Sequence, residues 1–369
     1  MYKENDLVRI AKRENNNKRK YLVVNQLQGK HVPVLPSKAL DMFQQLGRLV
    51  KTSYTDETLL IIGFAETATA IGAAVAIQAG GFYMQTTREI IDHVEYLFFS
   101  EAHSHATEQK LVKDDIDTVI DQIDRIVFIE DEVTTGNTIM NIIRLINAEF
   151  PNKIKFSVAS LLNGMNAEAS EIYEKYGIQT HSLIKTCHDG YEAEAEAVKG
   201  DGNYLVMDCN TCGYSYNQFV YGEYLNARRA VSGKDYLKAC ESLWLQIHND
   251  IDFTGFNKIL VLGTEEFMFP ALYVAGRIEE SDKNVRFHAT TRSPIVVSNE
   301  EIYPLHIRYE LASVYDKDRI TFVYDLDRYD MVLIITDSDC KDKNGIDSII
   351  NALQMSGNSN INFIRWCCK

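Results

Sequence analysis

The sequence lacks an excess of positive charge. Its 369 residues include 38 lysines and arginines against 52 aspartates and glutamates, which gives a formal net charge of −14. A surface that binds nucleic acid or anionic lipid needs basic side chains to replace counterions. We therefore expect no general nucleic-acid or membrane surface, and any anionic ligand has to be held by a local arrangement of residues.

The sequence also lacks a long apolar run. None approaches the roughly 20 residues that a membrane-spanning helix needs. The amino-terminal stretch MYKENDLVRIAKRENNNKRK is too polar for a secretory signal. Seven cysteines in a chain of this length do not form a disulfide framework. We therefore expect a cytoplasmic protein.

The cysteines give little support for a zinc site. Cys209 and Cys212 form a C-x-x-C pair, and Cys187 and His188 upstream are conceivable further ligands. A structural zinc site takes four ligands. The spacing favours ordinary buried or surface thiols over a metal site.

Short apolar runs in the first half of the chain predict buried strands. The first and third of them lead directly into helical patterns, and after the third run the isoleucines within residues 139–146 fall on one face of a helix. Continuous apolar strands alternating with amphipathic helices indicate an α/β fold with a parallel sheet covered on both faces. Such sheets bind ligands at the carboxyl ends of their strands. The predicted strands are Leu59 to Ile62, Phe82 to Met84, Ile126 to Ile129 and Phe156 to Leu162.

The second half of the chain repeats features of the first half in the same order. The string T-T-R occurs in both halves, and Asp124 precedes Asp131 by the interval that separates Asp330 from Asp337. Any two α/β units share a strand, a glycine and a helix, which is the alternative explanation. We interpret the echoes as an internal duplication in which only the first copy keeps V-T-T-G-N-T, because the second copy has C-K-D-K-N-G instead. The paired segments are 58–76 with 258–276, 82–90 with 285–295, and 124–138 with 330–344.

The length of the chain predicts two domains, because one hydrophobic core seldom serves so many residues. The periodic pattern is interrupted within residues 200–225, and a helical pattern over 223–250 leads into the second copy. We therefore expect one domain over residues 1–215 and a second α/β domain, interpreted as a degenerate copy, over 216–369.

Residues 129–138, IEDEVTTGNT, combine acids with a threonine- and glycine-rich turn after an apolar strand. A turn into a helix presents backbone N–H groups and the positive end of the helix dipole to one point. The threonine hydroxyls add donors, and Gly136 permits a backbone conformation that a side chain would obstruct. The turn therefore predicts a phosphate-binding site without the lysine of a P-loop.

The acids just before this turn suit a different chemical group. Glu130 and Asp131 are hydrogen-bond acceptors only, which suits a vicinal diol or the water shell of a magnesium ion. A ligand with a sugar diol close to a phosphate matches both parts of the stretch, and ribose 5-phosphate is such a ligand.

The string VFIEDEVTTGNT resembles the phosphoribosyl-pyrophosphate signature of type I phosphoribosyltransferases. With GFAETAT, QTTRE, EAHSHAT and ATTRSPI, nearly the whole chain from Tyr21 onward is similar to the subfamily found with tellurite-resistance and stress-response gene clusters, whose carboxy-terminal domain is named for its T-R-S-P string. The resemblance implies a Rossmann-like parallel sheet with helices on both faces and a hood. It also implies transfer of a phosphoribosyl group in nucleotide metabolism, with Mg²⁺ as cofactor and release of pyrophosphate.

The same resemblance implies roles for individual residues. Glu130 and Asp131 would face the ribose hydroxyls or Mg²⁺. The loop after the first strand would bind pyrophosphate together with Arg88. A helix-terminal acid is the alternative for Glu66, and a surface salt bridge is the alternative for Arg88. The implied 5-phosphate residues are Val133, Thr134, Thr135, Gly136, Asn137 and Thr138, and the implied pyrophosphate residues are Ala65, Glu66, Thr67 and Arg88.

Residues 101–110, EAHSHATEQK, have no apolar periodicity and occupy the interval where type I enzymes have a mobile loop. The resemblance makes His103 and His105 catalytic candidates beside Arg88 and Asp131, because histidine can exchange a proton near neutral pH. The alternatives are a metal site or histidines without a catalytic role.

The acceptor cannot be read from any motif. Residues 21–40 are the expected acceptor hood, with Lys30 and His31 as polar candidates. The residues Thr291, Arg292 and Ser293 of the second copy resemble an anion-binding turn, and a buried arginine ion pair explains them equally well. The expected partners are phosphoribosyl pyrophosphate and a small-molecule acceptor, and the resemblance allows a homodimer.

Two other functions compete with the transferase. One is a regulator that binds phosphoribosyl pyrophosphate without transferring it. The other is a ribose-phosphate pyrophosphokinase, which also doubles this fold but has its intact donor loop in the second half. Here the intact loop lies in the first half.

Overall fold

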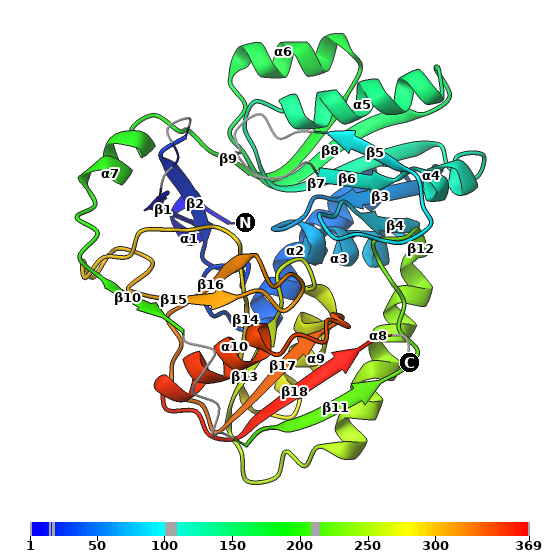
Figure 1. Ribbon diagram of the computed structural model, residues 1–369. Helices are drawn as coiled ribbons and strands as arrows, with labels where there is room; N and C mark the ends of the chain where they lie inside the picture. Colours follow the sequence, from blue (N-terminus) through cyan, green and yellow to red (C-terminus); the bar gives the residue numbers. More distant parts are fainter. Residues whose placement is uncertain (1, 15, 17–18, 100–108, 208–214, 368–369) are drawn as a thin grey trace. The chain divides into compact units, whose positions relative to one another are not determined.

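The computed structural model describes the chain except residues 1, 15, 17–18, 100–108, 208–214 and 368–369 (Figure 1). Two compact units make up the chain. The first comprises residues 1–4, 41–188 and 225–238, and the second comprises 5–40, 189–224 and 239–369. Among the described helices, none combines the length and the apolar composition of a membrane span.

The first unit is built on a six-stranded sheet. Its strands are parallel except at one edge, where the short β12 pairs antiparallel with β4. In spatial order they are β12 (Val231–Ser232), β4 (Phe82–Gln85), β3 (Leu59–Gly63), β7 (Arg125–Val133), β8 (Lys155–Asn163) and β9 (Gln179–Lys185). The four predicted strands correspond to β3, β4, β7 and β8 and are confirmed.

Helices and one hairpin complete the first unit. In α5 the isoleucines at 139, 142, 143 and 146 are all buried, as the predicted helix face requires. Helix α3 packs against β3, β4 and β7. The elements are α3 (Thr69–Ala79), α4 (Lys113–Val119), α5 (Asn137–Glu149), α6 (Ala167–Lys175) and the hairpin of β5 (Tyr96–Phe99) with β6 (Gln109–Val112).

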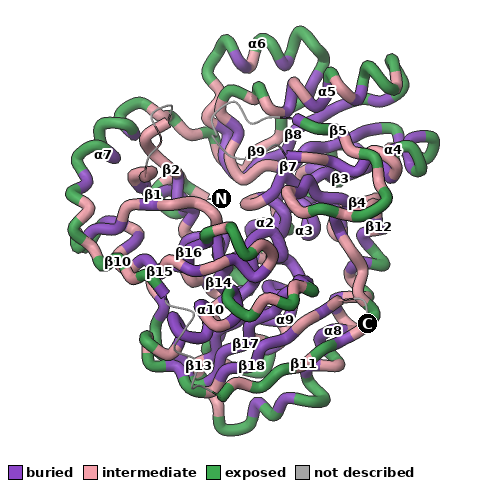
Figure 2. Tube along the Cα trace, viewed as in Figure 1, coloured by how far each residue is buried: buried purple, intermediate pink, exposed green. Residues whose placement is uncertain are grey.

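The second unit has a five-stranded sheet in which all pairings are parallel. Its central strand β17 is buried at every position (Figure 2). Helix α9 (Phe269–Glu279) packs against β13, β14 and β17. In spatial order the strands are β11 (Asn217–Tyr221), β18 (Ile361–Trp366), β17 (Met331–Thr336), β13 (Lys258–Gly263) and β14 (Asn284–Ala289).

Smaller elements surround this second sheet. They form a three-stranded sheet and an amino-terminal hairpin, together with short helices. The elements are α1 (Glu4–Leu7), β1 (Val8–Lys12), β2 (Tyr21–Asn25), α7 (Tyr191–Ala197), β10 (Asn203–Val206), β15 (Ile307–Ala312), β16 (Ile320–Tyr324) and α10 (Asn344–Met355). Two long helices, α2 (Pro36–Ser53) and α8 (Gly233–Asp250), contribute residues to both units.

The two central sheets have the same topology. The order β4-β3-β7-β8 in the first unit corresponds to β14-β13-β17-β18 in the second. The hydrogen bonds at the starts of the strands also correspond. Asp124 accepts a hydrogen bond from the Thr58 N–H at 2.8 Å, and Asp330 accepts one from the Lys258 N–H at 2.8 Å. This agreement supports the predicted internal duplication. The α/β fold class with a second α/β region is confirmed.

One predicted helix is shorter than expected. The helical pattern over 223–250 corresponds to α8, which begins only at Gly233. The Ser232 hydroxyl accepts a hydrogen bond from the Asp235 N–H at 3.0 Å and so caps the first turn, while residues 231–232 join the first sheet as β12. The predicted domain boundary near residue 215 stays a prediction.

Candidate functional site

The loops after β3 and β7 start side by side at the carboxyl edge of the first sheet. The strands pair in parallel up to Gly63 and Ile129, and the Phe64 N–H then donates to the Ile129 carbonyl at 3.0 Å. Both loops therefore leave the same edge, where parallel sheets bind ligands. The predicted pyrophosphate loop follows β3, and the predicted acids of the donor signature lie in the last residues of β7, just before its loop.

A side-chain hydrogen bond joins the loop after β3 to the end of β7. The Thr67 hydroxyl donates to Oδ1 of Asp131 at 2.7 Å. Burial raises the pKa of Asp131, the Thr67 bond opposes this rise, and the neighbouring Glu132 carboxylate adds to it. A cation or a set of hydroxyl donors beside Asp131 would therefore favour its charged form.

The backbone of the loop after β3 is fixed by a buried polar network. The Ala65 N–H donates to the Thr86 hydroxyl at 2.8 Å, and Nε2 of Gln109 donates to the Ala65 carbonyl at 2.8 Å. The Thr86 hydroxyl in turn donates to Oε1 of Gln109 at 2.6 Å. A cis peptide joins Ala65 to Glu66. Sequence reasoning missed Gln109, and it quoted Thr86 only as part of the T-T-R string.

The turn after β7 has the conformation that its glycine was expected to permit. Gly136 has φ 67° and ψ 4°, in the left-handed region, and serves as the residue before α5. Because glycine has no side chain, it gives the first N–H groups of the helix no capping bond. The nearest cap is a long hydrogen bond of 3.4 Å from the Asn137 N–H to the Thr135 hydroxyl. The start of α5 thus resembles an anion-binding helix terminus.

A tyrosine from the next helix supports this turn. The hydroxyl of Tyr173 in α6 donates to the Gly136 carbonyl at 2.8 Å. Burial raises the pKa of Tyr173, and the Glu130 carboxylate raises it further, which places that acid near the ring. Sequence reasoning missed this residue, since nothing in the pattern separates it from the other tyrosines of the chain.

The third acid of the signature has a histidine partner. Oε1 of Glu132 lies 3.2 Å from Nε2 of His188, which is also 3.0 Å from the Thr186 hydroxyl. A Cβ at Gly164 would lie 2.1 Å from this ring nitrogen, so glycine makes room for the histidine. His188 is thus engaged with an acid and a hydroxyl, while Cys187 is exposed.

The other predicted site residues differ in their exposure. Val133 is buried, Arg88 after β4 is partly exposed, and the side chains on the predicted phosphate turn reach solvent to different degrees. Glu66, Thr134 and Thr138 are partly exposed, and Thr135 and Asn137 are exposed.

Several predicted residues fall outside the described ranges. These are His103 and His105 of the expected loop and Cys209 and Cys212 of the C-x-x-C pair. Within the described part of the chain, no cluster of three or more His, Cys, Asp or Glu side chains is arranged to hold a metal ion.

The expectation that Lys30 and His31 face an acceptor is wrong. Both side chains are buried within the second unit. The Lys30 ammonium donates to the carbonyl oxygens of Glu265 at 2.6 Å and Thr290 at 2.9 Å. A buried ammonium needs such acceptors, so Lys30 stabilises the interior instead of offering a charge to a ligand.

The segment Thr291 to Ser293 was left open between an anion-binding turn and a buried ion pair. Arg292 is largely buried, and its guanidinium lies 3.6 Å from Glu265 and 3.6 Å from Glu266. The buried ion pair is the arrangement observed.

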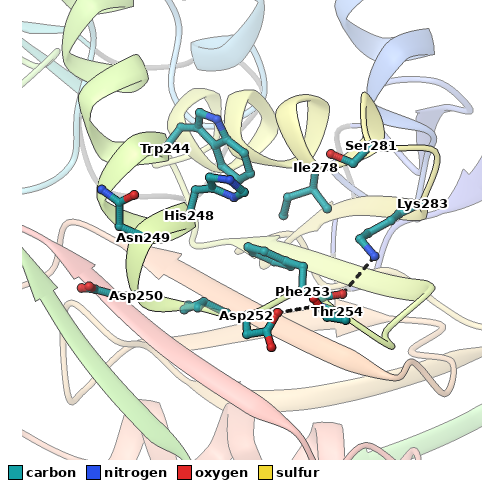
Figure 3. A pocket seen from close by; sticks show the side chains of 11 residues that line it. Trp244, His248, Asn249, Asp250, Asp252, Phe253, Thr254, Ile278, Ser281 and Lys283 are labelled. Carbon is teal, nitrogen blue, oxygen red and sulfur yellow. Dashed lines mark hydrogen bonds between the residues drawn. The ribbon is translucent and has the colours of Figure 1, made fainter.

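A cavity of about 420 Å³ lies in the second unit, at the carboxyl end of α8 (Figure 3). Its wall includes Trp244 and His248, whose rings stack with centroids 4.9 Å apart, and Phe253 below them. The Lys283 ammonium at its rim donates to the Phe253 carbonyl at 2.9 Å. None of the predicted donor-site residues lines this cavity.

Comparisons with known proteins identify both halves of the chain. Residues 7–187 match a family model described as phosphoribosyl transferase. Residues 235–353 match a model described as the TRSP domain at the carboxyl side of that transferase. A search of curated proteins found no match.

Solved structures with detectable likeness include three phosphoribosyltransferases. Adenine phosphoribosyltransferase from Rhodothermus marinus is 13% identical, with 49% of this chain and 96% of that chain covered and a TM-score of 0.34. The Giardia lamblia enzyme with 9-deazaadenine is 17% identical, with 50% and 96% covered and a TM-score of 0.32. Orotate phosphoribosyltransferase from Mycobacterium tuberculosis with phosphoribosyl pyrophosphate is 17% identical, with 40% and 74% covered and a TM-score of 0.24.

The α/β fold and the signature strand-turn-helix, with the family match, define the protein as a phosphoribosyltransferase. More narrowly, the chain belongs to the family in which the phosphoribosyl transferase domain is followed by a TRSP domain. The resemblance to phosphoribosyltransferases that carry a TRSP domain is confirmed.

Proposed function

We propose that the protein transfers a 5-phosphoribosyl group from phosphoribosyl pyrophosphate to a base or base-like metabolite in a Mg²⁺-dependent reaction. The observation that carries the proposal is the hydrogen bond of 2.7 Å between Thr67 and Asp131. It links the loop proposed for pyrophosphate to the acids proposed for ribose, and these are the two ends of the bond that breaks.

The acids at the end of β7 are proposed to hold the ribose. Glu130 and Asp131 accept hydrogen bonds and cannot donate them when ionised, so ribose hydroxyls are suitable partners. The raised pKa of Asp131 supports this role, because hydroxyl donors or a cation would stabilise the carboxylate that burial penalises.

The turn before α5 is proposed to hold the 5-phosphate. The left-handed Gly136 lets the chain enter the helix without a bulky cap, and the helix dipole favours an anion at this end. Val133 anchors the turn in the core, and Thr134, Thr135 and Thr138 supply hydroxyl donors together with the backbone N–H groups of residues 134–138.

The loop after β3 is proposed to hold the pyrophosphate leaving group. The buried network around Ala65 uses the Ala65 N–H and fixes the backbone there, so that donors on the following residues 66 and 67 are already oriented before a ligand arrives. Arg88 would stabilise negative charge as it grows on the departing pyrophosphate. Glu66 opposes that charge unless a metal ion lies between them.

Glu130 and Asp131 are proposed to hold Mg²⁺ through its bound water or through the ribose hydroxyls, since carboxylate oxygens are the ligands that Mg²⁺ prefers. Bound Mg²⁺ would neutralise charge on the pyrophosphate and so assist its departure. The residues then position the ribose while the acceptor attacks the anomeric carbon from the opposite side, with no covalent enzyme nucleophile.

His103 and His105 are proposed as catalytic residues that act near the leaving group or take up the acceptor proton. The interval that carries them joins β5 to β6, and β6 supplies the Gln109 that fixes Ala65. A change at Gln109 would therefore act directly on the proposed pyrophosphate loop.

The proposal is tested by incubating the protein with phosphoribosyl pyrophosphate, Mg²⁺ and a panel of bases and cell-extract metabolites, and by measuring pyrophosphate release. We expect release that depends on one acceptor and on Mg²⁺ and that is lost in Asp131→Asn. Binding of the donor without turnover above that variant would favour the non-catalytic regulator instead.

A further inference from the structure

The second unit preserves the loop framework of the proposed pyrophosphate site. The Glu265 N–H donates to the Thr290 hydroxyl at 2.9 Å, as the Ala65 N–H donates to the Thr86 hydroxyl at 2.8 Å. The backbone N–H groups of these threonines also make equivalent bonds. Thr86 donates to the carbonyl of Gly63 at the end of β3, and Thr290 donates to the carbonyl of Gly263 at the end of β13, at 3.0 Å in each case. Glu265 therefore occupies the position of Ala65.

The hairpins after these strands correspond as well. Thr87 bridges to Lys110 in the β5–β6 hairpin, and Thr291 bridges to Phe322 in the β15–β16 hairpin. The residue after each of these threonines is an arginine, Arg88 in the first unit and Arg292 in the second. The second unit thus shows the surroundings of Arg292, the equivalent of Arg88, where Glu265 stands at the position of Ala65.

The Glu265 carboxylate occupies a pocket for an anion. It is 1% exposed, and Oε2 accepts a hydrogen bond from Nη1 of Arg319 at 2.9 Å. Nε of Arg292 lies 3.6 Å from the same oxygen, and the Ser313 hydroxyl donates to the other oxygen. Two guanidinium groups and a hydroxyl converge on this carboxylate, which is the donor set that a phosphate or carboxylate ligand prefers.

Asp337, the acid equivalent to Asp131, also accepts hydrogen bonds from protein groups. Asp337 follows Asp330 by the same interval that separates Asp131 from Asp124. One oxygen of Asp337 accepts from the Tyr315 hydroxyl at 2.6 Å, and the other accepts from the Tyr224 hydroxyl at 2.6 Å. Two hydroxyl groups therefore bind this acid, as the ribose hydroxyls are proposed to bind Asp131.

The phosphate turn itself is replaced in the second unit. Asp342 stands at the position of Gly136, five residues after the equivalent acid in both copies. Its carboxylate accepts a hydrogen bond from the Asn344 N–H at 3.0 Å, at the start of α10. An acidic side chain at this helix terminus takes the place proposed for a phosphate.

We propose that the second unit is a self-occupied copy of the donor site, in which Glu265 fills the anion pocket formed by Arg292, Arg319 and Ser313. The chain then binds phosphoribosyl pyrophosphate once, in the first unit. Removal of the Glu265 side chain opens a site in the TRSP domain for a small carboxylate or phosphate anion. The assignment of ligand groups rests on the function proposed above, but the occupied pocket does not.

The first experiment is chemical rescue of Glu265→Ala in the full chain. This change places the residue of the first copy in the second and removes the carboxylate that Arg292 and Arg319 share, while Arg292 keeps Glu266 at 3.6 Å and Arg319 keeps Asp316 at 3.7 Å. We expect Tm to fall by several degrees and acetate to restore most of that loss, whereas chloride at equal ionic strength does not. Glu301→Ala, an exposed acid in the same unit, is the control and should show neither effect.

The second experiment measures the stoichiometry of phosphoribosyl pyrophosphate binding to the unmodified chain by calorimetry with Mg²⁺. One molecule per chain supports the proposal, and two overturn it. A folded Glu265→Ala variant that acetate does not stabilise also overturns it. If the unmodified chain binds no donor, the function proposed for the first unit fails, and acetate rescue still decides whether the second pocket holds an anion.

Discussion

The hydroxyl of Tyr173 donates to the carbonyl of Gly136 across 2.8 Å. A Cβ at Gly136 would lie 2.4 Å from the same hydroxyl oxygen, closer than any real contact. The conformation and the crowding therefore both require glycine at this turn. Tyr173, which the sequence did not single out, thus limits which residues can replace Gly136 in the signature turn.

Gly136→Ala should disrupt the turn for two reasons, the left-handed φ of 67° and the contact with Tyr173. We expect a loss of stability of roughly 2 kcal/mol or more and much weaker donor binding. Gly177→Ala is the matched control, because Gly177 also has φ 67° but a Cβ added there would meet no atom within 4 Å. Thermal unfolding and calorimetric titration with phosphoribosyl pyrophosphate measure both effects, and equal behaviour of the two variants would contradict the role of Tyr173.

Asp131→Asn should make the ligand-free protein more stable at neutral pH while abolishing transfer. The folded-state pKa of Asp131 is raised above its ordinary value of 3.8, mainly by burial. Its contribution to stability is therefore present below that value and is lost as pH rises through the folded pKa. The amide should remove this loss, so the gain in Tm over the unmodified protein should appear at pH 7 and vanish below about pH 3.8. Thr67→Val removes the hydrogen bond that lowers the pKa of Asp131, so it should weaken donor binding and lower Tm more at pH 7 than below about pH 3.8.

Arg88→Ala should slow the transfer more than it weakens ground-state binding, because charge on pyrophosphate grows during the reaction. Loss of one such group lowers kcat by about 100-fold in comparable sites. Arg88→Lys should recover little, since lysine lacks the planar fork of donors. Steady-state kinetics separate kcat from KM, and Arg144→Ala, an exposed arginine on α5, serves as the control. A rise in KM with unchanged kcat would limit Arg88 to binding.

His288 should make the second unit sensitive to acid. Burial lowers the pKa of His288 to about 4, the nearby Lys30 also lowers it, and the carbonyls of Gly29 and Tyr324 that face its two ring nitrogens oppose this shift. The unfolded chain binds a proton near pH 6.5 but the folded chain does not until about pH 4. Stability should therefore fall as pH decreases through this window, by about 1.4 kcal/mol per pH unit.

The measurement for His288 is the free energy of unfolding in urea between pH 7 and pH 4. His288→Asn should be less stable at pH 7 but should lose less stability in acid than the unmodified protein. His248→Gln, at an exposed position of the same unit, should leave the slope with pH unchanged. An unchanged slope in His288→Asn would contradict this prediction.

Truncation after residue 215 should leave the amino-terminal hairpin without its core. Ala11 and Val24 pack in one buried cluster with Ile295, Phe322 and Tyr324. We expect rapid proteolysis of residues 5–40 in the fragment and protection of the same residues in the full chain. Limited proteolysis with mass spectrometry gives the comparison. Equal protection in the fragment would show that residues 1–215 fold independently.

The local elements were predictable because their signals are local. Continuous apolar runs identified β3, β4, β7 and β8, and the isoleucine spacing identified α5. The repeated strings also indicated the second α/β region, since equivalent hydrogen bonds require equivalent residues at the strand ends.

Long-range partners were not predictable in the same way. Lys30 was expected to face a ligand, yet it lies more than two hundred residues away in sequence from the carbonyls of Glu265 and Thr290 to which it donates. Gln109 is a similar case, because its contact with Ala65 depends on the path of a hairpin. A single sequence contains no periodic signal for such pairs.

The placement of the amino-terminal hairpin also bears on protein synthesis. Residues 5–40 leave the ribosome well before Phe322 and Tyr324, which belong to the buried cluster that contains Ala11 and Val24. The nascent chain therefore cannot complete this core until residue 324 has been translated. The apolar residues of the hairpin therefore stay exposed, or are bound by chaperones, while the intervening α/β unit folds.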